Sequence, residues 1–182
     1  SHFYQHTKSN GDRISIDTAS RNWKFNPNLN NLFINHSIFP TSGTEDNHFS
    51  ISVNNFLIST SACVGHSIIF NVFEPLTFKP ILVNGTWNAG ACLNGKNPFN
   101  YEWDDRNIEN RKKMMEFMDS IPTGAYVVVR KILDQPYENE VFAEQLKADE
   151  QVLGAGNSLY HKLKNAGFAQ IDSFNRPRTY VH

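Results

Sequence analysis

The chain has 182 residues, with 17 Lys plus Arg, 18 Asp plus Glu and a formal net charge of -1. This length suits one domain with a core of its own, and the balanced charge leaves no broad basic surface for nucleic acid or an anionic membrane. No apolar run approaches the roughly 18 residues of a membrane-spanning helix. We therefore expect neither nucleic-acid binding nor membrane insertion.

The first half of the sequence predicts β-strands joined by loops. Apolar and polar residues alternate at 13–18, 31–39 and 48–53, which is the period of a half-buried strand. The segment GHSIIFNVFE at 65–74 is more continuously apolar, so it predicts a central strand with both faces covered. A hairpin is expected to follow at 76–83. Asn and Gly, which favour turns, are frequent between these segments.

The middle of the chain predicts a strand, a helix and a second central strand. FNYEW at 99–103 has strand character, and Asp104 and Asp105 then stand where caps of a helix are expected. That helix should end before Pro122. The β-branched run in AYVVVRKIL at 125–133 predicts a buried strand, the best defined in the chain.

Two further helices and two closing strands are predicted near the carboxyl end. The helices occupy 138–154 and 157–167, each ending at a glycine, and the strands are FAQIDSF at 168–174 and RTYVH at 178–182. Strands crowd the first half of the chain and helices the second. This order favours an α+β fold over a doubly wound parallel sheet.

The common signatures of metal binding and catalysis are missing from the sequence. The seven histidines have neither the spacing of a zincin helix nor a Cys partner at finger spacing, so we assign no metal and no cofactor. Cys63 and His66 are the nearest approach to a nucleophile and a base, but residues three apart on a strand point to opposite faces. We predict that the chain is not an enzyme. Cys63 and Cys92 are compatible with one disulfide or with two thiols.

Aromatic and charged residues near the predicted loops suggest a ligand-binding surface. Trp87 and Trp103 offer flat apolar faces, whereas Asp134, Arg176 and Arg178, near strand ends, offer acceptors and fork-like donors. Recognition of a sugar needs this combination. Trp also fills protein cores, so composition alone leaves a structural role for both tryptophans open.

The order of motifs resembles the interleukin-like epithelial-mesenchymal transition inducer (ILEI) domain family. The resemblance is carried over residues 65–182 by IIFNVFEPLTFKPI, FNYEW, IPTGAYVVV, DQP, LKADEQVLGAG and FNRPRTYV, in this order. It implies two packed, mainly antiparallel sheets flanked by about three helices, in a single domain. Residues 1–60 would form an amino-terminal β extension, which looks more like the bacterial surface or secreted versions of the family.

The resemblance also implies a non-catalytic function and a site. In one member, the stem of a glycosyltransferase, an acid after the central strand and an Arg in the terminal motif hold a sugar, and they correspond to Asp134 and Arg176 here. The chain departs from the terminal motif at Pro177 and Thr179, which stand where the family has Asp and Trp.

We therefore expect a non-enzymatic, extracellular or cell-surface module that binds a glycan or another surface ligand through Asp134, Arg176, Arg178, Trp87 and Trp103. The chain would be part of a larger secreted or surface protein. The alternative is a structural or protein-interaction module of such a protein, which an exposed apolar patch or edge strand would favour.

Overall fold

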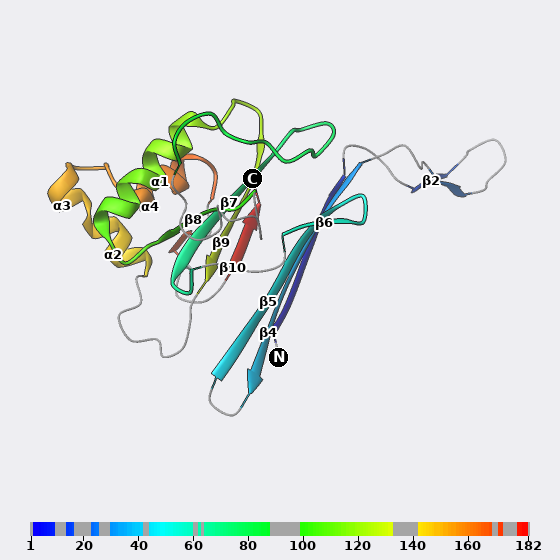
Figure 1. Cartoon of the computed structure of the whole chain (residues 1–182), viewed down its shortest axis with the longest axis horizontal. Coiled ribbons are helices and arrows are strands. Elements are labelled where there is room, and N and C mark those ends of the chain that lie inside the picture. Colours follow the sequence, from blue (N-terminus) through cyan, green and yellow to red (C-terminus); the bar gives the residue numbers. More distant parts are fainter. Residues whose placement is uncertain are drawn as a thin grey trace.

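The structure is a computed structural model of the chain. It describes residues 2–9, 14–16, 23–25, 30–41, 44–59, 62, 64–87, 99–132, 142–168, 171–172 and 178–181. These residues form three layers: helices, a sheet that the helices cover, and a second sheet with long strands behind it (Figure 1). The predicted α+β class, with two packed and mainly antiparallel sheets flanked by helices, is confirmed.

The middle layer, here called the helix-covered sheet, has the order β10, β9, β7, β8, and each neighbouring pair is antiparallel. Its strands are β7 (Ser67–Phe73), β8 (Tyr101–Asp104), β9 (Tyr126–Ile132) and β10 (Arg178–Val181). All seven residues of β7 are buried, as are the last five of β9. The two strands predicted to be central are therefore the two central strands of this sheet.

The outer layer, here called the long sheet, has the order β1, β4, β5, β6. Its strands are β1 (His2–Ser9), β4 (Asn31–Thr41), β5 (Thr44–Val53) and β6 (Phe56–Ser59), and a separate pair consists of β2 (Ile14–Ile16) and β3 (Trp23–Phe25). The three strands predicted in this region correspond to β2, β4 and β5. The sequence did not predict β1, β3 or β6.

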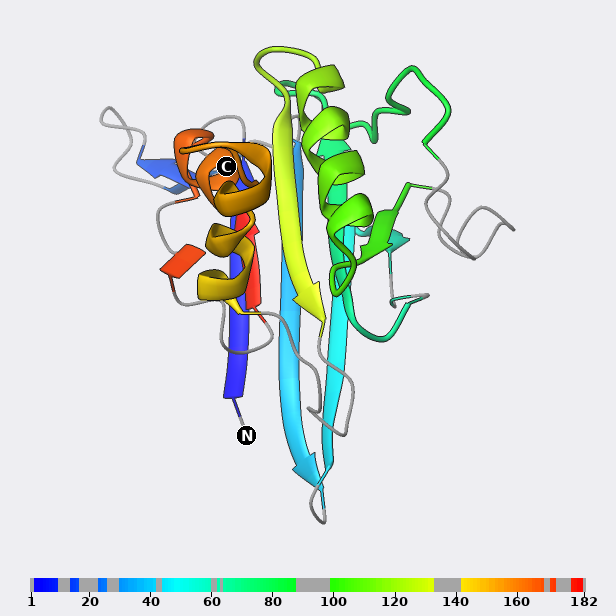
Figure 2. The same cartoon turned by 90° about the vertical axis from the view of Figure 1, so that its left-hand side faces the viewer.

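Helices pack on one face of the helix-covered sheet. They are α1 (Ile108–Ser120), α2 (Ala143–Ala148), α3 (Glu150–Leu153) and α4 (Leu159–Asn165). Figure 2 shows α1 in green and α4 in orange in front of this sheet, and the blue strands of the long sheet behind it. The helix predicted at 138–154 is divided at Asp149, which is the C-cap of α2 and the N-cap of α3.

The cap of α1 differs from the prediction. Asn107 is the N-cap, and its side-chain oxygen accepts from the backbone N–H of Glu109 at 2.7 Å. Asp104 and Asp105 instead bind Arg106 and Lys131. An Asn two residues further on therefore satisfies a backbone donor at the start of the helix.

The predicted strand at 168–174 is wrong where the structure describes it. Phe168 and Ile171 are both buried, and the N–H of Ile171 donates to the carbonyl of Phe168 at 3.1 Å. The two apolar side chains reach the core with a spacing of three, which a one-turn 3₁₀ segment allows and a strand of period two does not.

Phe117 lies at the centre of the core between the helices and the sheet. Its side chain is fully buried, and its ring is 4.5 Å from that of Tyr101, 5.3 Å from Trp103, 5.4 Å from Trp87 and 5.5 Å from Phe70, measured between centroids. Aromatic pairs at such distances add to the free energy gained from burial alone. One residue of α1 thereby binds three separate segments of the chain together.

A second core joins the two sheets. Leu32, Ile34, Ile51 and Val53 of the long sheet form a cluster with Phe73, Phe78 and Val128. These residues lie toward one end of β4 and β5, and both strands continue beyond the helix-covered sheet (Figure 2). None of the helices in the described part of the chain has the length and apolar character needed to span a bilayer.

We predict that Phe117→Ala lowers the free energy of unfolding by about 3–5 kcal/mol, because it removes a fully buried aromatic side chain and leaves a cavity. Urea denaturation followed by circular dichroism measures the change. The matched control is Phe56→Ala, which truncates a side chain that is 76% exposed and should change stability by less than about 0.5 kcal/mol. Equal losses in the two variants would contradict the assignment of Phe117 as the centre of this core.

Candidate functional site

Two of the predicted site residues, Arg178 and Trp103, lie at one end of the helix-covered sheet. β10 begins at Arg178, which pairs with Lys131 of β9, and β9 ends one residue later at Ile132. Asp134 and Arg176 lie outside the described residues, as do Cys63 and Cys92. Four strand ends meet here: the end of β9, the start of β10, the start of β7 and the end of β8. The register shows this, because Lys131 of β9 pairs with Ile68 of β7, and Ile68 pairs with Trp103 of β8.

The two predicted tryptophans belong to the core around Phe117. Trp103 is only 4% exposed and its ring packs against Phe70 and Phe117, so it presents no open face on which a sugar ring can stack. Trp87 is partly buried against Phe117, and its Nε1 donates to the carbonyl of Asn84 at 3.0 Å. Both side chains thus have the structural role that the sequence left open.

Two ion pairs are buried at this end of the sheet, on the helix side. The Lys131 ammonium binds the Asp105 carboxylate, with both side chains fully buried. Arg111 of α1 makes a two-pronged contact with Asp149, at 2.6 Å from Nε and 2.8 Å from Nη2, and its Nη1 donates to the carbonyl of Asp105 at 2.8 Å. Burial raises the pKa of the Asp105 carboxyl, and the charge of Lys131 opposes that rise.

On the opposite face of the sheet, Arg130 is fully buried between the two sheets. Its Nη2 donates to Asn71 Oδ1 at 2.6 Å, to Ser59 Oγ at 3.1 Å and to Asn100 Oδ1 at 3.3 Å. Ser59 belongs to β6 of the long sheet, and its hydroxyl donates in turn to Asn100 at 2.8 Å. The guanidinium therefore connects the two sheets through hydrogen bonds.

Glu102 supplies negative charge on the same face as Arg130. Both residues pair with Ile69 across the sheet, one from each neighbouring strand. The Glu102 carboxylate accepts from the backbone N–H of Val64 at 2.6 Å and from Ser67 Oγ at 3.1 Å. Burial lowers the pKa of Arg130 to about 9 and Glu102 opposes this shift, so Arg130 is charged at neutral pH.

We call these six buried residues the charged sheet end. They are Glu102, Asp105, Arg111, Arg130, Lys131 and Asp149. Three cations offset three anions, so the set carries no formal net charge. Because each group is buried and engaged within the fold, the charged sheet end does not itself face a ligand. Residues 133–141 follow β9 in the sequence, and residues 173–177 precede β10.

The charged sheet end cannot be recognised from the sequence alone, although the sequence contains one signal for it. Arg130 and Lys131 follow three valines inside a strand predicted to be buried and central. A charge in such a strand requires a buried partner, because an isolated ion in an apolar interior is costly. The pattern implies that acidic partners exist, but not that Asp105 and Glu102 are among them.

Among the described residues, no group of three His, Cys, Asp or Glu side chains is placed to hold a metal ion. His66 is described and partly buried, but Cys63 is not, so the geometry of that pair is outside the described residues. No family model matches the sequence, and no curated protein or solved structure matches it either.

We predict that Arg130→Met lowers the free energy of unfolding by about 3–5 kcal/mol, because it leaves the buried Glu102 carboxylate without this cation and removes the hydrogen bonds between the sheets. Chemical denaturation at neutral pH measures the loss.

The matched control is Arg106→Met. Arg106 pairs with Asp104 at 2.6 Å, but its side chain is 40% exposed, so the loss should stay below about 1 kcal/mol. A smaller loss for Arg130→Met than for Arg106→Met would show that the buried guanidinium does not join the sheets.

Proposed function

We propose that the chain is a non-enzymatic ligand-binding module of a secreted or cell-surface protein, and that its ligand is a carbohydrate. The proposed contacts are Asp134, Arg176 and Arg178, at the charged sheet end. The observation that carries the proposal is the register of β9 and β10, which places Arg178 opposite Lys131 although 47 positions separate them in the sequence.

Chain connectivity limits how far apart the proposed contacts can be. Paired Cα atoms on antiparallel strands are about 5 Å apart, and successive Cα atoms 3.8 Å. Asp134 follows Lys131 by three residues, so its Cα is within about 17 Å of that of Arg178. This upper limit is compatible with a carboxylate and a guanidinium that contact the same small oligosaccharide.

The chemistry of these residues suits hydroxyl groups. A guanidinium presents several donors in a fixed plane, and a carboxylate accepts two or more hydrogen bonds, so together they match the alternating donors and acceptors of a sugar. The buried ion pairs beneath them support the proposal, because a rigid base reduces the entropy lost when loops bind a ligand. Trp87 and Trp103 support the sheet in this proposal.

The resemblance to the ILEI family supports the same residues and an extracellular or surface location. In that resemblance Asp134 and Arg176 correspond to the sugar-holding acid and Arg. The sequence also lacks a recognised catalytic motif, which agrees with a binding function.

We predict that the folded protein binds members of a broad glycan array, and that Asp134→Ala and Arg178→Ala each weaken binding of the best glycan at least about tenfold, equivalent to about 1.4 kcal/mol. Isothermal titration calorimetry measures the affinity. Arg106→Ala, which removes an exposed arginine from a different segment, is the control and should bind normally. A folded protein that binds nothing on the array would refute the carbohydrate proposal.

A second candidate function, protein interaction, is favoured by exposed apolar side chains on β6 of the long sheet and in the turn after β7. Phe56 is 76% exposed, Leu57 61% and Leu76 71%, and we call these three residues the Phe56 patch. The side-chain nitrogen of Asn54 donates to Asn30 at 2.8 Å, and that of Asn30 donates to the carbonyl of Leu76 at 3.1 Å. Leu76 is thereby linked to the turn that leads into Phe56.

The position of the Phe56 patch suits contact with another chain. Phe56 and Leu57 lie on β6, at one end of the strand order of the long sheet, whereas Leu76 lies in the turn after β7. The turn before β6 has Asn54 and Asn55 with φ of 50° and 70°, the left-handed values of a tight hairpin turn. Large apolar side chains at a strand edge are a recurring feature of protein-binding surfaces.

We predict that a photo-crosslinking amino acid at position 56 captures a neighbouring protein in the cells that produce this chain, whereas the same group at Lys113, exposed on α1, does not. Mass spectrometry of the crosslinked product is the measurement. Leu57→Asp should reduce capture from position 56, because a charge disfavours an apolar interface. Equal capture at the two positions, or none at position 56, would count against a protein-binding role for the patch.

A further inference from the structure

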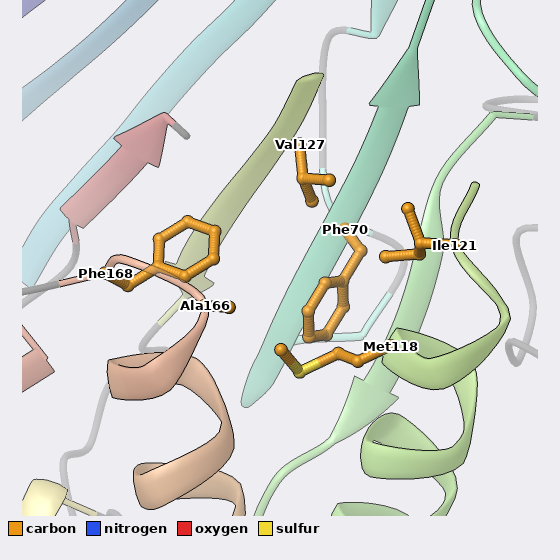
Figure 3. A pocket seen from close by; sticks show the side chains of 6 residues that line it. All are labelled: Phe70, Met118, Ile121, Val127, Ala166 and Phe168. Carbon is orange, nitrogen blue, oxygen red and sulfur yellow. The ribbon is translucent and has the colours of Figure 1, made fainter. Parts of the chain in front are cut away.

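An apolar cavity of about 140 Å³ lies between the helices and the helix-covered sheet (Figure 3). Phe70 and Val127 project into it from β7 and β9, and Met118 and Ile121 from the end of α1. The carboxyl end of α4 and the segment after it complete the lining, which we call the Phe70 cavity. Its residues are Phe70, Met118, Ile121, Val127, Ala166 and Phe168.

The side chains of the Phe70 cavity carry no nitrogen or oxygen atom. The cavity is partly open to solvent and its lining is mainly apolar, so an apolar group that enters it leaves water for an apolar surface. A sugar is a poor occupant, since its hydroxyl groups would lose their hydrogen bonds to water without replacement.

The size of the cavity fixes the size of its ligand. Apolar cavities of similar volume, lined by aliphatic and aromatic side chains in other proteins, accept a benzene ring. The Phe70 cavity therefore has room for one six-membered ring or a compact group of about six carbon atoms. The thioether of Met118 can adjust to the shape of such a group, because Met has three flexible torsions.

The surroundings favour an uncharged ligand. Lys162 of α4 and Asp119 of α1 form an ion pair at 2.5 Å. Asp119 adjoins Met118, and Lys162 lies one helical turn before Ala166, so this pair connects the two helices beside the cavity. Asp119 is 69% exposed, so water screens this pair and it has little influence on the ligand; the apolar lining itself disfavours a charged group.

We propose that the Phe70 cavity is a binding site for a small, uncharged, apolar molecule of about the size of benzene. The site is separate from the proposed carbohydrate site. Val127 and Ile132 are five residues apart on β9, or about 17 Å, and Asp134 follows Ile132. The inference therefore goes beyond the proposed function and does not depend on it.

Toluene and benzoate are suitable probes, because they share a ring and differ in charge. In titrations of the whole chain followed by methyl NMR spectra, toluene should cause saturable shifts of Val127, Ile121 and Met118 signals. Benzoate should bind at least tenfold more weakly. No saturable toluene binding, or equal binding of the two probes, would overturn the proposal.

Two substitutions test the place of binding. Ala166→Leu fills the cavity and should weaken toluene binding at least tenfold, whereas Ala148→Leu, which adds the same side chain at an exposed position of α2, should leave it unchanged. Unaltered binding in folded Ala166→Leu would overturn the assignment. If Ala166→Leu does not fold, Met118→Ala decides: the enlarged cavity should gain binding of naphthalene, and no gain would overturn the proposal.

Discussion

The burial of Arg130 between two sheets is the constraint on which the rest of this structure depends. A guanidinium without access to water is costly unless its donors are engaged. Here Asn71 and Asn100 from the helix-covered sheet side and Ser59 from the long sheet accept its hydrogen bonds. Because these partners come from both sheets, the alignment that brings them to Arg130 Nη2 also packs the apolar cluster of Leu32, Ile34 and Phe73.

β9, the strand that contains Arg130, also places a positive charge on the opposite face of the helix-covered sheet. Lys131 follows Arg130, so its side chain points to the helices, where it binds Asp105. Asp105 in turn offers its carbonyl to Arg111, and Arg111 holds Asp149 between α2 and α3. Two consecutive cations thus connect β9 to both neighbouring layers. Arg178, one of the proposed ligand contacts, begins β10 and pairs with Lys131 on this strand.

The two ends of β9 have different surroundings in the helix-covered sheet. Its end carries buried charges of both signs, and Asp134, a proposed carbohydrate contact, follows it in the sequence. Its start lines the Phe70 cavity, where the side chains offer only apolar contact. Phe56 and Leu57 of the exposed Phe56 patch lie on the other sheet. The three proposals therefore concern different parts of the fold and different classes of ligand.

The local pattern of the sequence determined the elements of the fold and the class to which it belongs. Period-two alternation predicted β4 and β5, the β-branched run predicted β9, and apolar spacing predicted α1 and α4, because these signals depend only on neighbouring residues. Short strands such as β3 and β6 were missed, since three or four residues carry little periodicity and form through pairing with a partner.

Only the tertiary structure decided which residues became a core and which a surface. Trp103 and Phe56 are both large and aromatic, yet Trp103 is 4% exposed and Phe56 76% exposed. The exposed fraction of each side chain depends on which other elements pack against its strand, and the amino-acid composition does not specify this. Likewise the sequence showed two cations in a buried strand, but their partners Asp105, Glu102 and Ser59 are 26 to 71 positions away. The sequence does not identify these partners, because only the folded chain brings such distant groups together.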